Sequence, residues 1–308
     1  MEKHLRNLTT EQVNEKTKNI DMCTTEEILE IINEEDCLVP LAVKCEISNI
    51  AKAVDIIVEQ IKKGGKLYYV GAGTSGRIGI LDASECPPTY GTDPELVQAI
   101  IAGGSDAIIK SIEGAEDNEA EGRAIIQAKG INRNDVVIGI TASGRTTFVL
   151  GAIREARKMG AVTVGISNNS ISQIRNEADF AITPLVGPEV IMGSTRMKSG
   201  TSQKLVLNMI TTTVMIKLGK VYGNLMVDLK PTNIKLIDRV IRIVMNATGT
   251  TEKETRKWLE LSGFNPKIAI IMKKTGVSKE AAEKLLNDNS GFVTKAIESY
   301  NNTCRQVE

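Results

Sequence analysis

Residues 66–89 read KLYYVGAGTSGRIGILDASECPPT, and this stretch decides the fold of the chain. It starts with an apolar run of strand length, Lys66–Val70, and continues into the turn Gly71–Arg77, which opens a helix predicted over Ser75–Ser84. The glycines of the turn allow close approach to the backbone, and the first turn of the helix offers free N–H groups to an anion. The stretch therefore predicts a strand, an anion-binding turn and a helix in succession.

The same alternation of short apolar runs and longer helical patterns continues along the chain. It predicts an α/β fold in three layers, with a five-stranded parallel sheet covered by helices on both faces. The predicted strands are Lys66–Val70, Val97–Ala102, Asp135–Thr141, Val162–Ser167 and Phe180–Pro184. The further predicted helices of this part are Ser105–Lys129, Thr146–Met159 and Lys198–Gly219.

Helical patterns without strands flank the sheet on both sides. A capping box at Thr24–Glu27 opens a pattern that fits two helices up to Lys63. After Asn224 four or five short helices are expected, with Thr250, Asn265, Ser278 and Asn289 as caps. The predicted domains are N-terminal helices over 1–64 that pack on the α/β domain, the α/β domain over 65–228, and a small C-terminal helical domain over 229–308.

The composition argues against several kinds of partner. Lys plus Arg and Asp plus Glu both number 38, with no long block of like charge, which disfavours nucleic acid and anionic membranes. The N-terminal residues lack the apolar core of a signal peptide, and no apolar run approaches the roughly 18 residues of a membrane span. We therefore expect a cytoplasmic protein that binds a small polar molecule.

Histidine and cysteine usage narrows the chemistry. The single histidine, His4, lies in a terminal segment, so histidine-based triads and metal sites are disfavoured, and proton transfer must fall on other side chains. The five cysteines are odd in number and lack CxxC spacing, which argues against a zinc site and a disulfide framework. We expect no metal.

The turn at Gly71–Gly76 also matches the GxGxxG pattern of dinucleotide-binding proteins. That function predicts an acidic residue at the end of the second strand, roughly 20 residues on. Here the second strand ends instead in Ala102-Gly103-Gly104, which disfavours a dinucleotide. A purely structural turn is a further alternative, but a phosphate held by the backbone N–H groups of Gly73, Thr74 and Ser75 and by the hydroxyls of Thr74 and Ser75 is favoured.

Two later loops carry similar chemistry. Thr141–Thr146 follows the third predicted strand, and its residues Ser143, Gly144 and Thr146 can help to surround a phosphate or can merely cap the next helix. Gly187–Lys204 follows the last strand and contains Ser194, Thr195 and Lys198, a density of donors that capping alone does not explain. These residues are the remaining candidates for binding the substrate.

Glu85 and Glu116 are the candidates for acid–base chemistry. Glu85 lies where the first helix is expected to stop, and Glu116 lies in a helical stretch that Gly114 interrupts. Each could be a solvated surface acid. Without a usable histidine, however, two carboxylates are the natural acid–base pair.

These motifs closely resemble the N-acetylmuramic acid 6-phosphate etherases. The likeness rests on Gly71–Thr89, Glu113–Asp117 and Gly187–Lys204 and extends over most of the chain, from Leu8–Glu11 to the helical tail. It implies a sugar isomerase (SIS) fold, phosphate held by the loops after the first and third strands, and no metal or redox cofactor. The reaction that it implies is cleavage of the D-lactyl ether of N-acetylmuramic acid 6-phosphate to N-acetylglucosamine 6-phosphate and D-lactate, in recycling of cell-wall sugars.

The resemblance also assigns roles to the two glutamates. Glu116 would remove the proton on carbon 2 of the ring-opened sugar, and Glu85 would protonate the departing lactate oxygen. Glu85 would then activate the water that adds at carbon 3, and we expect it to be the carboxyl that is protonated at neutral pH. SIS proteins commonly pair, so a homodimer is expected.

Two alternatives share this fold. An aldose–ketose isomerase would also need a base beside carbon 2 but would release no lactate. A sensor that resembles the glucokinase regulatory protein would bind sugar phosphates without turnover. The single SIS domain and the presence of both glutamates favour the etherase.

Overall fold

The computed structural model describes residues 8–229 and 234–305, so His4 lies outside the described residues. The chain divides into two compact units. The first contains the described residues up to Ser84 together with Pro94–Thr211, and the second contains Glu85–Asp93 together with the described residues from Thr212 onward.

The first unit is built around a five-stranded parallel sheet with the strand order β2-β1-β3-β4-β5, which confirms the predicted sheet. Gly71 is in register with Ile101 on one side and Ile140 on the other, so β1, β2 and β3 end level at their carboxyl edge. The connections from β1 and β3 run in opposite directions along the sheet, and open α/β sheets bind ligands at such a switch point. The strands are β1 (Leu67–Gly71), β2 (Val97–Ile101), β3 (Val136–Ile140), β4 (Val162–Ile166) and β5 (Phe180–Ile182).

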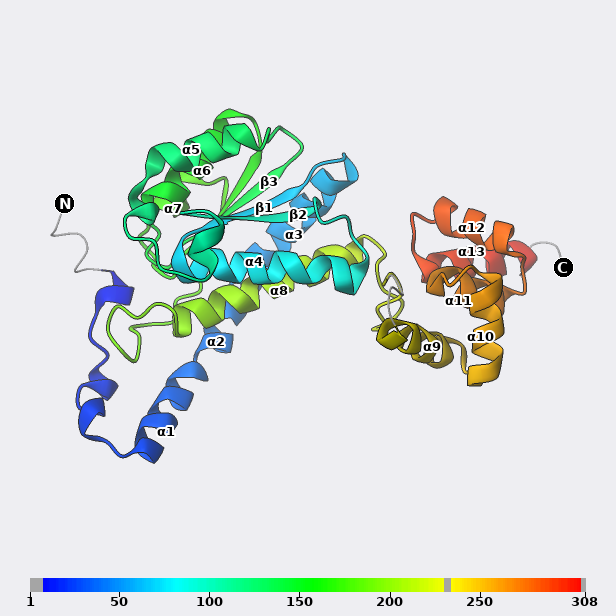
Figure 1. Cartoon of the computed structure of the whole chain (residues 1–308), viewed down its shortest axis with the longest axis horizontal. Helices are drawn as coiled ribbons and strands as arrows, with labels where there is room; N and C mark the ends of the chain where they lie inside the picture. Colours follow the sequence, from blue (N-terminus) through cyan, green and yellow to red (C-terminus); the bar gives the residue numbers. More distant parts are fainter. Residues whose placement is uncertain (1–7, 230–233, 306–308) are drawn as a thin grey trace. The chain divides into compact units, whose positions relative to one another are not determined.

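Helices cover both faces of this sheet (Figure 1). On one face, α5 (Glu119–Ala128) and α6 (Thr147–Lys158) contribute to an apolar core with Tyr68 and Val70 of β1. On the other face lie α4 (Gly73–Tyr90) and α8 (Lys198–Lys217). Successive side chains of a strand point to opposite faces, and this alternation lets β1 serve both layers.

A buried carboxylate, Asp82, fixes α4 to the second face. It accepts hydrogen bonds from Tyr69 Oη of β1 at 2.9 Å and from Asn208 and Thr211 of α8 at 2.7 and 3.1 Å. Burial raises the pKa of Asp82, against the opposing effect of these three hydrogen bonds. The first helix after β1 is thereby held to both the sheet and α8.

Two predicted helices differ from the observed ones. α4 continues through Pro87 and Pro88 to Tyr90 instead of ending near Ser84. Each proline removes only its own N–H donor, and the stop comes from Gly91, whose φ of 61° is typical of the residue after a helix and whose N–H donates to the Pro87 carbonyl.

The second difference concerns the segment between β2 and α5. The helix predicted over Ser105–Lys129 is three elements, namely η5 (Ser105–Ile108), η6 (Ala115–Asp117) and α5. Gly114 precedes η6 in the left-handed conformation with a φ of 72°, and this conformation interrupts the helix. Glu116, one of the two candidate acid–base residues, lies in η6 as a result.

The N-terminal part contains three α-helices rather than two, preceded by short 3-10 turns. The predicted capping box is confirmed, because Thr24 Oγ1 accepts from the Glu27 N–H while the Glu27 carboxylate accepts from the Thr24 N–H. The elements are η2 (Thr9–Glu11), η3 (Glu15–Thr17), η4 (Ile20–Met22), α1 (Thr25–Asp36), α2 (Val39–Lys44) and α3 (Ile47–Lys62). Between β4 and β5 lies α7 (Gln173–Glu177).

The second unit has a helical core of its own. The described residues from Ile234 to Arg305 form five helices, within the predicted four or five, and Asn265 and Ser278 cap two of them as expected. Thr251, not Thr250, caps α10, and Asn289 ends α12 instead of opening the next helix. The helices are α9 (Ile234–Thr248), α10 (Glu252–Leu261), α11 (Pro266–Thr275), α12 (Lys279–Asp288) and α13 (Val293–Arg305).

Candidate active site

A cavity of about 320 Å³ lies at the carboxyl edge of the sheet, where β1 and β3 end. Residues from the loops after both strands line it, and these strands flank the switch point, where open α/β sheets bind ligands. Its wall is mostly small and hydroxyl-bearing, with two carboxylates. The lining residues are Glu11, Ala72, Gly73, Thr74, Ser75, Glu116, Ile140, Thr141, Ala142, Ser143, Thr146, Gly193 and Thr195.

The loop after β1 contributes backbone N–H groups and hydroxyls. α4 begins at Gly73, so the first N–H groups of a helix that is 18 residues long lie at the cavity wall together with Thr74 and Ser75. Gly71 makes this tight turn possible, because a Cβ there would lie 2.6 Å from the Gly76 backbone nitrogen. The turn is therefore suited to a phosphate group, with the positive end of the helix dipole behind it.

The loop after β3 contributes a network of hydroxyls. Thr141 Oγ1 lies 2.8 Å from Thr146 Oγ1 and 3.3 Å from Ser143 Oγ, and it accepts from the Gly144 N–H at 3.2 Å. Thr146 occupies the N-cap position of α6, but its side chain makes no capping hydrogen bond. The Thr146 hydroxyl instead belongs to the hydroxyl network at the cavity, so helix capping does not explain why a threonine is present here. Gly144 shapes the loop and does not line the cavity.

Glu116 lines the same cavity as the loops after β1 and β3 and lies in the 3-10 turn that follows Gly114. Its carboxylate is exposed and lines the cavity, and its backbone carbonyl accepts a hydrogen bond from Thr147 Oγ1 of α6 at 3.3 Å. The position of Glu116 is thereby tied to the helix that starts at the hydroxyl network. A carboxylate and a set of anion-binding donors share one cavity, as an acid–base site on a sugar phosphate requires.

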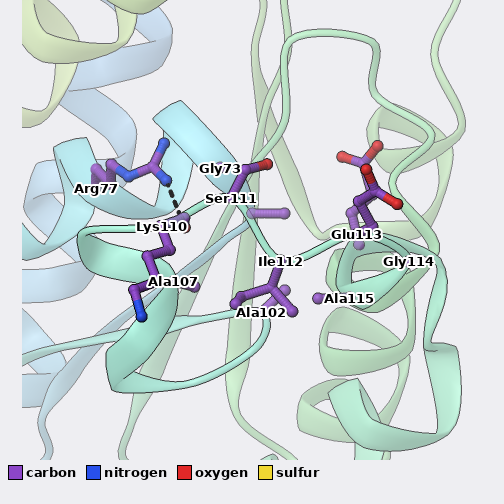
Figure 2. Close-up of a pocket in the computed structure, with 12 residues that line it drawn as sticks. Gly73, Arg77, Ala102, Ala107, Lys110, Ser111, Ile112, Glu113, Gly114 and Ala115 are labelled. Carbon is purple, nitrogen blue, oxygen red and sulfur yellow. Dashed lines mark hydrogen bonds between the residues drawn. The ribbon is translucent and has the colours of Figure 1, made fainter.

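A second cavity, of about 310 Å³, shares Ala72, Gly73 and Glu116 with the first. Figure 2 shows Gly73 and Arg77 on one wall and Glu113 on the other. Arg77 donates from Nε to the Ile108 carbonyl and from Nη2 to the Lys110 carbonyl, at 2.9 and 3.0 Å. These hydrogen bonds hold the backbone at Ile108 and Lys110, in the segment that leads to Glu116. Arg77 thereby supports the part of the cavity wall that this segment forms.

The segment before α8 reaches the first cavity through Gly193 and Thr195, while Ser194 does not line it. Lys198 was also expected to line the cavity, but it is not among the lining residues. Lys198 is 1% exposed, and its Nζ lies 2.6 Å from Glu35 Oε2 of α1. Its ammonium group needs a buried anion, and Glu35 supplies one.

Comparisons with known proteins agree with this geometry. The chain matches the model of the glucokinase regulatory protein N-terminal SIS domain over residues 49–157 and the SIS domain model over 120–213. It is 61% identical to the N-acetylmuramic acid 6-phosphate etherase of Clostridium acetobutylicum, over 96% of this chain and 98% of the relative. The chain belongs to the N-acetylmuramic acid 6-phosphate etherase family.

Further relatives carry the same name. The etherase of Caldanaerobacter subterraneus is 55% identical over 95% of this chain and 96% of its own length. Among solved structures, a phosphoheptose isomerase from Neisseria gonorrhoeae aligns with a TM-score of 0.48 and 17% identity, over 62% of this chain and 98% of that one. The etherase relatives and the two SIS-domain models confirm the resemblance seen in the sequence motifs, and with it the SIS fold.

Within this etherase-family chain, Glu85 is placed differently from the other candidates. It lies inside α4, twelve residues after Gly73, because the helix continues past Ser84. Its side chain is exposed and is not among the residues that line either cavity. It belongs to the segment 85–93 that groups with the helical unit.

Six lining residues were not selected from the sequence of this etherase-family chain: Glu11, Ala72, Ile140, Thr141, Ala142 and Gly193. Thr141 was quoted with its loop but was not chosen as a binding residue, although its place at a strand end could have marked it. Glu11 offered no such signal, since it precedes the first strand of the sheet by more than 50 residues.

The described residues include no group of three or more His, Cys, Asp or Glu side chains arranged to hold a metal ion. In the part of the chain that the structure describes, no helix is long and apolar enough to cross a membrane.

Proposed function

We propose that this protein cleaves the D-lactyl ether of N-acetylmuramic acid 6-phosphate, releasing D-lactate and N-acetylglucosamine 6-phosphate in the recycling of cell-wall sugars. The reaction makes it a carbon–oxygen lyase. The observation that carries the proposal is the cavity in which Glu116 faces the donors of two phosphate-binding loops. Membership of the etherase family supports the choice of substrate.

The phosphate is held by the loops after β1 and β3. Helix N–H groups and hydroxyls supply its oxygens with donors, and no lysine or arginine lines this cavity in the described residues. Because N–H and hydroxyl groups hold the phosphate, no lysine or arginine in the described cavity wall forms an ion pair with the carboxylates of Glu11 and Glu116. The residues proposed to bind the substrate from the cavity wall are Gly73, Thr74, Ser75, Ser143, Thr146 and Thr195. Gly144 and Ser194 would act only by shaping their loops, and Lys198 through its ion pair with Glu35.

The chemistry starts from the ring-opened sugar, whose aldehyde acidifies the proton on carbon 2. Glu116 takes this proton, the bond between carbon 3 and the lactyl oxygen breaks, and a second carboxyl donates a proton to the departing lactate oxygen. The resemblance to the etherases assigns this second role to Glu85, which does not line the cavity of Glu116, so its assignment rests on the sequence motif alone. The product of this step is an unsaturated aldehyde. Glu85, now ionised, takes a proton from the water that adds at carbon 3, and Glu116 returns a proton to carbon 2.

We further propose that the protein acts as a homodimer in the cytoplasm. Exposed apolar side chains on the N-terminal helices, such as Leu29, Leu41 and Ile47, support a protein–protein contact. Size-exclusion chromatography with light scattering tests the dimer, and a monomer at micromolar concentration would count against it. Cell fractionation tests the location.

The decisive experiment is incubation with N-acetylmuramic acid 6-phosphate and an enzymatic assay for D-lactate. Stoichiometric lactate and N-acetylglucosamine 6-phosphate are expected. Isomerised sugar phosphate without lactate would support the isomerase alternative, and binding without turnover would support the sensor alternative. Each of these two results contradicts the etherase proposal.

A further inference from the structure

The N-terminal segment before α1 is anchored beside the candidate site at its first turn. The Thr9 N–H donates to Asn169 Oδ1 at 2.8 Å, and Asn169 Nδ2 donates to the Ala142 carbonyl at 2.9 Å. Ala142 belongs to the phosphate-binding loop after β3, so a single buried amide joins this loop to the N-terminal segment. Leu8 and Thr10, on either side of Thr9, are also buried.

A second anchor follows a few residues later. Asn14 Nδ2 donates to Glu35 Oε2 at 2.8 Å, and the Thr17 hydroxyl donates to the Val190 carbonyl at 2.8 Å. Glu35 in turn holds Lys198 at the start of α8. The segment is thus tied to the strand-end loop on one side and to the segment before α8 on the other.

Glu11 lies between the two anchors, and its carboxylate lines the same cavity as Glu116. The side chain is half-buried, and its Oε2 lies 3.8 Å from the point where a Cβ on Gly193 would be. Among the described residues, none forms a hydrogen bond or an ion pair with this carboxylate. An anchored backbone therefore presents an unpartnered acceptor to the cavity.

The chemistry of the substrate limits what such an acceptor can bind. An ionised carboxylate accepts hydrogen bonds and donates none, so it repels phosphate and suits hydroxyl or amide N–H groups. A sugar phosphate carries such donors on its carbon chain, whereas inorganic phosphate has no carbon chain.

We propose that Glu11 is a substrate-binding residue that accepts hydrogen bonds from the hydroxyl and amide groups of the sugar. It makes the cavity select a sugar phosphate over phosphate alone. This inference rests on the sugar-phosphate binding that the proposed function requires, and it adds a determinant of specificity from the N-terminal segment.

Isothermal titration of the full chain with N-acetylglucosamine 6-phosphate and with inorganic phosphate tests the proposal. In Glu11→Gln the affinity for the sugar phosphate should fall about tenfold or more, because charge-assisted hydrogen bonds are lost. The affinity for inorganic phosphate should stay unchanged or rise. Glu11→Asp, which keeps the charge on a shorter side chain, should bind the sugar phosphate with an intermediate affinity.

Glu30→Gln is the matched control, since Glu30 is an exposed glutamate of α1 with no hydrogen-bond or ion-pair partner among the described residues. It should bind both molecules as the unmutated protein does. An equal loss of affinity for both molecules in Glu11→Gln, or no loss for either, would overturn the proposal. Lactate release by the unmutated protein is measured separately, so failure of the etherase function remains distinguishable from failure of this inference.

Discussion

Replacing Lys198 by Met should destabilise the α/β unit strongly. Lys198 and Glu35 are 1% and 4% exposed in their side chains, and the ammonium and carboxylate groups are 2.6 Å apart. Methionine keeps most of the volume and removes the charge. Glu35 then remains buried with only Asn14 and the exposed Lys16 as partners, at 2.8 and 3.3 Å.

The expected loss is about 3–5 kcal/mol of unfolding free energy, which is typical when one partner of a buried ion pair is removed. Lys63→Met provides the control. Its ion pair with Glu59 has the same 2.6 Å separation, but both side chains are at least half exposed, so little change is expected. Changing both buried partners, in Glu35→Leu with Lys198→Met, should recover much of the loss because no unpaired buried charge remains.

The pH dependence gives a second signature. Burial raises the pKa of Glu35, but the hydrogen bond and charge of Lys198, helped by Asn14 and Lys16, bring it below its usual value. An acid of this kind contributes stability above its unfolded pKa and loses it as the pH falls through the folded pKa. In Lys198→Met the pKa of Glu35 should rise, so the stability difference from the unmutated protein should shrink between pH 7 and pH 4.

Urea denaturation followed by far-ultraviolet circular dichroism measures these differences. The only tryptophan, Trp258, lies in the helical unit, so its fluorescence identifies the transition of that unit. A loss below about 1 kcal/mol for Lys198→Met, or a difference that does not change with pH, would refute the reasoning.

Three further predictions concern the catalytic base, the turn after β1 and the helical unit. Glu116→Gln should lower D-lactate release by about 10²–10⁴-fold in a steady-state assay while titration still detects binding of the sugar phosphate. Gly71→Ala should lower the thermal midpoint of the circular dichroism signal, because its Cβ would lie 2.6 Å from the Gly76 nitrogen. Thr251→Ala removes the capping box of α10 and should cost about 1 kcal/mol in the Trp258 fluorescence transition, whereas Thr303→Ala near the C-terminus should not.

Local sequence patterns were sufficient to predict the sheet and to bring the loops after β1 and β3 to one cavity, while phosphate binding by these loops stays a prediction. Each strand is a short buried run, and the loops follow from the level strand ends of a parallel sheet. The helix boundaries were less predictable. Pro87 and Pro88 suggested a stop that Gly91 in fact provides, and Gly114 broke a helix that the apolar spacing had joined. The division at residues 64/65 and 228/229 stays a prediction.

Side chains whose partners lie far away in the sequence could not be assigned from their motifs. Lys198 stands in a donor-rich segment, so a substrate contact was the natural interpretation of its charge. Its actual partner, Glu35, is 163 residues away on α1. No local pattern reports a pairing over that distance.

Glu11 and Glu35 show how the same N-terminal segment produces opposite environments for one residue type. Both are glutamates before the sheet, yet Glu35 is enclosed with a lysine and an asparagine, while Glu11 meets no protein donor in the described structure. The difference arises because Asn169 binds Thr9 and Glu35 binds Asn14, one on each side of Glu11. The Glu11 side chain itself lines the cavity. Where binding depends on backbone N–H groups, as after β1, a motif alone predicts the role. Where binding depends on a charged side chain, the role of that side chain depends on whether a residue distant in the sequence forms an ion pair or a hydrogen bond with it.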